Sequence, residues 1–254
     1  MRFAAIYDIH ANLPALEAVL DEIRTLAVDR IVVGGDVLPG PMPVESLELL
    51  ARFETPASFI LGNGDREVLA LMNGIETEWY RSARESWREP VRWTAEQLGP
   101  EHARLIESWP PSCRLDVAGL GGVHFCHATP RNDTDCFTRE TPEEVLLPLF
   151  AGVEDPVVIC GHTHMQFDRV IGPARVVNAG SVGMPFGEPG ACWLLLDEDV
   201  QLRRTSYDLD AAAARVRRTQ YPQIEAFVAH CLLDPPPERQ MIDLYAGYDL
   251  SVSA

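Results

Sequence analysis

Short apolar runs alternate with amphipathic stretches in the first part of the chain. The runs at 3–7, 30–33 and 57–61 are rich in aliphatic residues and too short for helices, which predicts strands. Between them, apolar residues recur every three or four positions at 13–23 and 43–53, which predicts two amphipathic helices. Strands that alternate with helices of this length indicate parallel β structure with right-handed crossovers.

The pattern changes at residues 66–110. Glutamates alternate there with arginines, and the stretch contains four of the five tryptophans of the chain. We expect two or three helices in this stretch, which would form a cap-like insertion at the edge of the domain. The alternative is a solvated charged face with the tryptophans packed beneath it.

Short runs with β-branched and aromatic residues follow from residue 112 onward. They predict strands at 114–117, 122–126, 157–160, 166–171, 174–177, 191–196 and 201–205. Helices are expected at 143–150 and 208–219. The fold class that follows is α/β with a mixed strand pattern.

Three consecutive prolines near the C-terminus interrupt the pattern at 235–237. Prolines break regular structure, and we expect a loosely held stretch after them. We therefore interpret the chain as a single domain over residues 1–233, which includes the helical insertion, and a C-terminal extension over 234–254.

The composition is that of an ordinary globular protein, with 46% hydrophobic and 23% charged residues. The six cysteines are scattered and form no CxxC pair, which predicts reduced thiols in a cytoplasmic protein. The first residues show no signal-peptide pattern. No stretch approaches the roughly 20 apolar residues that a membrane span requires.

Acidic side chains outnumber basic ones by 38 to 21, and the formal charge is −17. Nucleic-acid binding depends on a basic surface, so we expect no nucleic acid polymer as a partner. An acidic membrane surface would also repel this chain. All 21 basic residues are arginine, which excludes a mechanism that uses a Schiff-base or P-loop lysine.

Five short polar motifs stand at the ends of predicted strands. They are Asp8-Ile9-His10, Gly34-Gly35-Asp36, Gly62-Asn63-Gly64-Asp65, His127 and Gly161-His162-Thr163-His164. The carboxyl ends of parallel strands share one crevice, where ligands bind. The spacing from Asp8 to Asp36 is 28 residues and from Asp36 to Asn63 is 27, about one strand–helix unit each. We therefore expect these side chains at the same edge of a sheet.

The motifs supply two carboxylates, one amide oxygen and four imidazoles. The residues are Asp8, His10, Asp36, Asn63, His127, His162 and His164. Such ligands suit a borderline or hard divalent metal. Seven are too many for one tetrahedral ion and suit two ions that share a carboxylate, for which Asp36 is the natural bridge. Taken singly, an aspartate before a helix is more often an N-cap, and a lone histidine is more often structural.

The order of these motifs resembles the motif series of calcineurin-like metallophosphoesterases. In one-letter code the series reads D-x-H, GD, GN-x-D, a lone His and GHTH. The resemblance spans residues 8–164 and extends to the turn Asn178-Ala-Gly-Ser181, whose alternative interpretation is a simple sheet connection. It implies a β-sandwich flanked by helices (α/β/β/α). It also implies two divalent ions, which in this family are Mn, Fe or Zn.

The resemblance assigns Asp8, His10, Asp36 and His164 to one metal, and Asp36, Asn63, His127 and His162 to the other. It implies in-line attack by a metal-bound hydroxide on a phosphorus held by both ions. We therefore expect hydrolysis of small phosphodiesters or nucleotide phosphoanhydrides. The alternatives are a protein serine/threonine phosphatase and a non-catalytic metal-binding scaffold of the same fold.

The chain departs from the family pattern at Gly64, where many members have a histidine that acts as general acid. Loss of a positioned acid costs about 10²–10⁴-fold in rate, so we expect good leaving groups to be favoured. His124 or a metal-bound water could substitute for the missing acid.

We place Asp65 beside Asp36 in the catalytic set, with the role of orienting a ligand or water. Arg66 and Arg131 are candidate phosphate contacts because a guanidinium group binds phosphate with two hydrogen bonds. The alternative for both arginines is a surface salt bridge.

Overall fold

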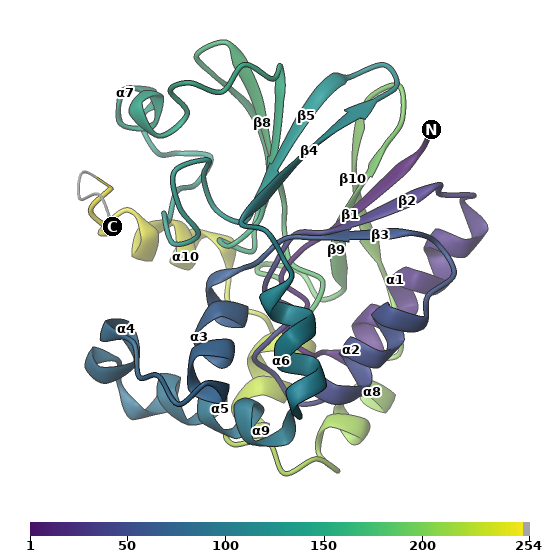
Figure 1. Ribbon diagram of the computed structural model, residues 1–254, viewed down its shortest axis with the longest axis vertical. Coiled ribbons are helices and arrows are strands. Elements are labelled where there is room, and N and C mark those ends of the chain that lie inside the picture. Colours follow the sequence, from purple (N-terminus) through teal and green to yellow (C-terminus); the bar gives the residue numbers. More distant parts are fainter. Residues whose placement is uncertain (251–254) are drawn as a thin grey trace.

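Two five-stranded sheets face each other in the computed structural model, which describes residues 1–250, and helices cover their outer faces (Figure 1). The first sheet has the order β10-β9-β1-β2-β3, with β1, β2 and β3 parallel and β9 antiparallel to β1. Its strands are β1 (Phe3–Ile6), β2 (Arg30–Val33), β3 (Ala57–Phe59), β9 (Ala191–Leu196) and β10 (Val200–Thr205).

The second sheet has the order β4-β5-β6-β8-β7, with β5, β6 and β8 parallel. Its strands are β4 (Ser112–Val117), β5 (Gly121–Cys126), β6 (Val157–Cys160), β7 (Gln166–Ile171) and β8 (Ala174–Ala179). The ten strands predicted from the sequence are therefore confirmed, with ends that differ by at most two residues.

Helices α1 (Leu13–Thr25) and α2 (Pro43–Arg52) connect β1, β2 and β3 as predicted. The Asn12 side chain caps α1 by accepting a hydrogen bond from the Ala15 amide. The apolar side of α1 is buried under the first sheet, and each aliphatic side chain buried there contributes about 1.5–3 kcal/mol.

Strands β1 and β9 of the first sheet are apolar on both faces because both faces are covered. On β1, Ala4 and Ile6 face the helices, whereas Phe3, Ala5 and Tyr7 face the second sheet. This explains why the first apolar runs show no alternation with polar residues.

The stretch at 66–110 contains more helices than expected. Four helices occur from residue 63 to 107, namely α3 (Asn63–Met72), α4 (Glu78–Ser82), α5 (Glu85–Gln97) and α6 (Pro100–Glu107). Trp109, which follows them, is buried and stacks on Phe59 with ring centroids 5.1 Å apart. Trp87 is 62% exposed. Packing beneath a charged face therefore describes Trp109 but not Trp87.

Near the middle of the chain, α7 (Glu143–Leu146) continues into a short 3-10 helix, Leu147–Leu149. The C-terminal part contains α8 (Leu209–Val216), shorter than expected, α9 (Ile224–Phe227), a π-helical stretch Val228–Leu233 and α10 (Glu238–Tyr245).

The expectation of a loosely held stretch after the prolines is wrong for residues 238–250. They contain helix α10, and Ile242 and Leu250 are buried. The rest of the expected extension, 251–254, lies outside the described residues. Within the described part of the chain, no helix has the length and apolar character to cross a membrane.

Candidate metal centre

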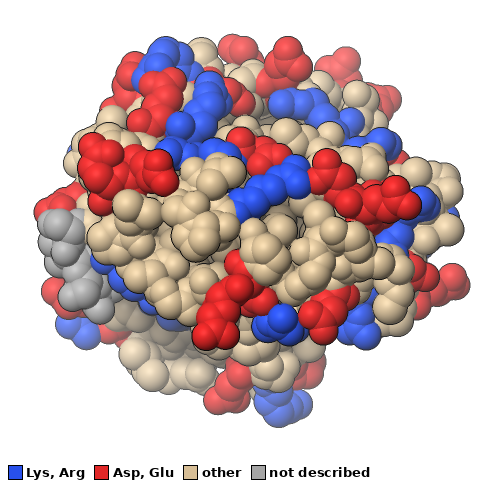
Figure 2. All heavy atoms as spheres, turned by 90° about the horizontal axis from the view of Figure 1, so that it is seen from above, with Lys and Arg blue, Asp and Glu red and all other residues tan. Residues whose placement is uncertain are grey.

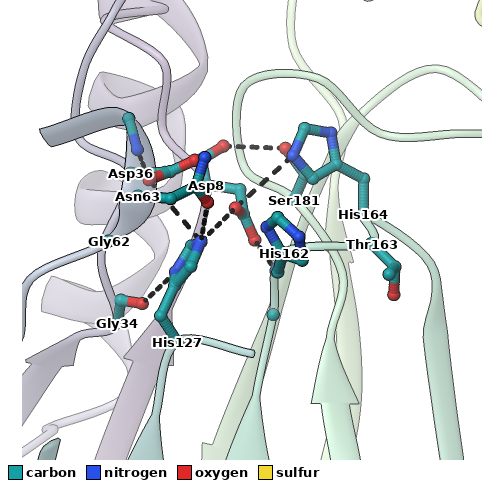
Figure 3. A network of polar contacts seen from close by, with 12 residues as sticks. Asp8, Gly34, Asp36, Gly62, Asn63, His127, His162, Thr163, His164 and Ser181 are labelled. Atoms are coloured by element: carbon teal, nitrogen blue, oxygen red, sulfur yellow. Dashed lines mark hydrogen bonds and ion pairs between the residues drawn. The ribbon is translucent and has the colours of Figure 1, made fainter. Parts of the chain in front are cut away.

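The seven predicted ligands converge where the carboxyl ends of the two sheets meet. Figure 3 labels all of them except His10. Asp8 and His10 follow β1, Asp36 follows β2, and Asn63 begins α3 after β3. His127 follows β5, and His162 and His164 follow β6. The spacing of the motifs along the chain thus predicted their location correctly.

Three of these side chains form one group: Asp8, His10 and His164. The Nε2 atoms of His10 and His164 are 3.2 Å apart, and His164 Nε2 lies 3.4 Å from Asp8 Oδ1. Asp8 is fully buried and His10 is 8% exposed.

A second group contains Asp36, His127 and His162. His127 Nε2 lies 3.5 Å from Asp36 Oδ1. The Asn63 side-chain amide joins this group, with one terminal atom 3.1 Å from His127 Nε2 and 2.9 Å from His162 Nδ1.

Asp36 lies between the two groups. Its Oδ1 faces His127 of the second group, and its Oδ2 lies 3.8 Å from His10 Nε2 of the first. The Gly64 amide donates to Oδ1 at 2.7 Å and fixes the carboxylate in this orientation. The two oxygens of Asp36 therefore face different groups. Asp8 Oδ1 also lies near both groups, at 3.4 Å from His164 Nε2 and 3.8 Å from His127 Nε2.

One oxygen of the centre fits a cation better than a hydrogen-bond donor. Asp8 Oδ1 is buried and accepts no hydrogen bond from any described residue. The Asn63 side-chain amide lies 3.2 Å from the Asp133 carbonyl and beside two imidazoles, and its nitrogen donates to these groups when its oxygen is turned toward the Gly64 amide. A buried carboxylate oxygen without a hydrogen-bond donor is stabilised by a cation, so the Asp8 side chain and the imidazoles around it fit divalent metal ions.

The outer nitrogens of three histidines are each held by another group. His127 Nδ1 is 2.9 Å from the Gly34 carbonyl, and His164 Nδ1 is 2.8 Å from the Met184 carbonyl. His162 Nε2 lies 3.3 Å from Cys136 Sγ. Such contacts orient a metal-binding histidine and fix which nitrogen carries the proton. No sequence motif indicated Cys136 or Met184 for this role.

The ligands themselves adopt strained backbone conformations. Asp8, His10, Asp36, His162 and His164 all have φ between 47° and 66°. A non-glycine residue in this left-handed region costs on the order of 1–3 kcal/mol and is concentrated at functional sites. The predicted ligands therefore take part directly in the tight turns after the strands.

The Asn178–Ser181 turn holds two ligand-bearing loops, so it is more than a sheet connection. Asn178 Nδ2 donates to the Gly161 carbonyl at 2.6 Å, just before His162. Ser181 Oγ donates to the Asp8 carbonyl at 2.7 Å and accepts from the Met184 amide.

The Asp65 carboxylate binds backbone amides of two neighbouring segments. Its carboxylate accepts hydrogen bonds from the amides of Leu38 at 2.9 Å and Gly62 at 3.1 Å. Burial and the nearby Asp36 carboxylate raise the pKa of Asp65 above its usual value. Asp65 therefore ties the loop of Asp36 to the helix start that bears Asn63.

His124 lies away from the centre. Burial lowers the pKa of His124, and the nearby Asp155 carboxylate opposes this effect. Asp155 precedes β6, whereas the predicted ligands His162 and His164 follow that strand. Val123 and Phe125 point into the core between the sheets, so His124 belongs to the opposite face of β5. The suggestion that His124 replaces the missing acid is therefore wrong.

The two candidate phosphate contacts are engaged in ion pairs. Arg66 binds both oxygens of Asp133 and also Glu67. Arg131 binds Asp135 through two nitrogens. These contacts match the salt-bridge alternative, and a role in phosphate binding stays a prediction for both.

The four imidazoles differ in their ability to accept a metal. Burial and the neighbouring histidines lower the pKa of His10 and of His162 to about 4, so both are neutral at pH 7. His127 is different. Although burial opposes it, the carboxylates of Asp36 and Asp8 and the Gly34 carbonyl raise the pKa of His127 to about 10.

Metal binding at pH 7 should therefore release about one proton, because His127 is protonated in the ion-free protein and a metal requires the neutral ring. The apparent affinity should rise with pH up to about 10. Calorimetric titration of the chelator-treated protein in buffers of different ionisation enthalpy measures this release. The assignment fails if no proton is released near pH 7.

A sequence model of the calcineurin-like phosphoesterase superfamily domain matches residues 1–200. An uncharacterized protein of Methanocaldococcus jannaschii is 27% identical over 247 residues, which cover 87% of this chain and 93% of that protein.

Two solved structures are similar over nearly their full length. A hypothetical protein from Pyrococcus horikoshii gives a TM-score of 0.75 at 20% identity and covers 91% of this chain and 97% of its own. A metallophosphoesterase from Sphaerobacter thermophilus gives a TM-score of 0.69 at 25% identity, and the match covers 91% of this chain and 98% of that chain. The two-sheet α/β fold predicted from the sequence is therefore confirmed as that of metallophosphoesterase structures.

Proposed function

The chain belongs to the calcineurin-like phosphoesterase superfamily, and we propose that it is a cytoplasmic phosphoesterase that uses two divalent metal ions. We further propose that its substrates are small phosphodiesters or nucleotide phosphoanhydrides. One observation carries the proposal: two groups of buried ligands lie on either side of Asp36, whose two oxygens face one group each.

Asp8, His10, Asp36 and His164 would hold one ion, and Asp36, Asn63, His127 and His162 the other. Bound divalent ions lower the pKa of a water ligand and offset the charge of a phosphate group. The chain itself supplies orientation. The Gly64 amide fixes Asp36, and the carbonyls of Gly34 and Met184 fix the rings of His127 and His164.

The charge of the chain supports a small substrate. Figure 2 shows arginines interspersed with acidic side chains on the face seen from above, and the net charge of the chain is −17. Such a surface repels a polyanion, whereas two divalent ions can attract one phosphoryl group at the centre.

Purified protein loaded with Mn²⁺ should contain about two ions per chain and hydrolyse bis-p-nitrophenyl phosphate. Aryl esters should react faster than alkyl esters because no histidine stands at position 64 to protonate the leaving oxygen. Elemental analysis measures the metal content, and single-turnover rates on matched aryl and alkyl phosphates measure the preference between the two esters.

A chelator should abolish turnover, and readdition of Mn²⁺ should restore it. Absence of turnover with Mn, Fe or Zn would contradict the proposal and favour a metal-binding scaffold. Equal rates for alkyl and aryl esters would contradict the role given to Gly64.

A further inference from the structure

The C-terminal segment 234–250 lies beyond the residues that match the family model, yet it is fixed to a loop of the metal centre. In Figure 1, helix α10 runs close to the loops at the carboxyl end of the second sheet. Two ion pairs connect its first turn to the loop after β5. Glu238 binds Arg139 at 2.7 Å, and Arg239 binds Glu140 at 2.9 Å.

The other end of the segment is anchored in the same loop. Leu250 is 8% exposed and belongs to the buried apolar cluster that contains Phe137. Its carbonyl accepts a hydrogen bond from Arg131 Nη2 at 3.1 Å. The segment therefore holds this loop on both sides of Cys136.

The segment also contacts the loop between β8 and β9. The Pro236 carbonyl accepts a hydrogen bond from the Gly187 amide at 2.9 Å. In this loop, the Met184 carbonyl contacts His164 Nδ1, and the Phe186 ring stacks on the His164 ring with centroids 5.4 Å apart. One segment thus touches both loops that orient the two histidines of the Gly-His-Thr-His motif.

The donor and the acceptor can be assigned in the contact between Cys136 and His162. His162 Nδ1 lies 2.9 Å from the Asn63 side-chain amide, on the side of the proposed metal position, and accepts a hydrogen bond from the amide nitrogen when the amide oxygen is turned toward the Gly64 amide. The ring proton then belongs on Nε2, which donates to Cys136 Sγ. The thiol proton is free to point to the Thr134 carbonyl, 3.6 Å from Sγ. Cys136 is 8% exposed.

We propose that segment 234–250 is a strap that holds Cys136 and the Met184 carbonyl against His162 and His164, and that Cys136 is a positioning residue for His162. The inference rests on the proposed metal centre, of which the unpartnered buried oxygen of Asp8 is an independent sign. Burial and the nearby Cys136 raise the pKa of Tyr245, which agrees with a strap that reaches this part of the centre.

Replacing Cys136 by alanine should weaken binding of one of the two ions by about 10- to 100-fold, as for other lost partners of metal-binding histidines. Cys136→Ser should restore most of the affinity because a hydroxyl also accepts a hydrogen bond. Calorimetric titration with Mn²⁺ measures the affinity, and the visible spectrum of the Co²⁺-loaded protein reports the ligand geometry. Cys231→Ala is the matched control, since this buried thiol lies in a different apolar cluster.

The strap is tested separately by the charge reversal Arg139→Glu, which opposes Glu238. It should weaken the same ion by about twofold to fivefold, within the range of an exposed ion pair. The reciprocal variant with both Arg139→Glu and Glu238→Arg should restore the affinity. Arg217→Glu, which reverses the exposed pair with Glu225 elsewhere on the surface, should leave it unchanged.

Each outcome decides a different question. If the wild-type protein binds no divalent ion, the proposed function fails. If the wild type binds two ions and Cys136→Ala binds them equally well, only the positioning role of Cys136 is overturned. A sulfur-to-cobalt charge-transfer band in the wild type would also overturn it, because Cys136 would then be a ligand. Unchanged affinity in Arg139→Glu would overturn the strap.

Discussion

Replacing Asp36 by asparagine should lower phosphodiester hydrolysis by on the order of 10³-fold, comparable to the loss of a central charge-stabilising group in other enzymes. Asp36 is the one ligand whose two oxygens face different groups, so its change affects both metal positions. Asparagine has nearly the same size and keeps an oxygen for the Gly64 amide, so the fold should survive. The metal content should fall from about two ions to one or none.

Variants of residues that belong to only one of the two groups are compared with Asp36→Asn. His127→Ala and Asn63→Ala should also abolish turnover, but each should leave the ion held by Asp8, His10 and His164 in place. Asp168→Asn, at a surface carboxylate paired with Arg175, is the matched control and should retain wild-type activity. Two tightly bound ions and full activity in Asp36→Asn would contradict the bridging role.

The position of the ligands could be predicted because it depends on repeated local patterns. Each apolar run forms a strand of one parallel set, and each following helix returns the chain to the same end of the sheet. Spacings of 28 residues from Asp8 to Asp36 and 27 from Asp36 to Asn63 were therefore enough to bring these side chains together.

The groups that orient the ligands could not be predicted in this way. Cys136 contacts His162 across 26 residues, with no periodic pattern between them. The left-handed conformations of Asp8 and Asp36 oppose local preference and are maintained by tertiary contacts, such as the Ser181 hydroxyl on the Asp8 carbonyl.

The C-terminal helix was missed for a related reason. The prolines before it indicate a break, but Pro237 stands directly at its N-terminal cap, where proline is compatible with a helix. Ion pairs with Arg139 and Glu140 anchor this helix, and each pair joins residues that are 99 positions apart in the sequence. Only the folded structure brings these charges together.

Gly64 is the position at which the structure explains a departure from the family pattern. A Cβ atom there would lie 2.4 Å from the Leu38 carbonyl oxygen and 2.9 Å from Pro39 Cδ. It would also lie 3.2 Å from Asp36 Oδ1, which the Gly64 amide binds. A side chain at this position must therefore displace backbone next to the proposed bridging ligand.

Gly64→His should consequently fail to create a general acid and should damage the centre instead. The related Gly64→Ala should lose about 1–3 kcal/mol of stability, as overpacked sites do, and the histidine variant should lose more. For a domain of this size, each kcal/mol corresponds to a fall of about 2–4 °C in the melting temperature. Metal affinity should also fall in both variants, because Asp36 loses its fixed orientation.

Thermal unfolding with and without Mn²⁺, together with turnover of matched aryl and alkyl phosphates, separates these effects. Gly247→Ala is the control, since its added Cβ would lie at an ordinary 3.4 Å from the Leu244 carbonyl. Its melting temperature should stay close to that of the wild type. A Gly64→His protein that is as stable as the wild type and hydrolyses alkyl phosphates faster would show that the loop can accommodate an acid. In that case the contact with Leu38 would no longer account for the glycine.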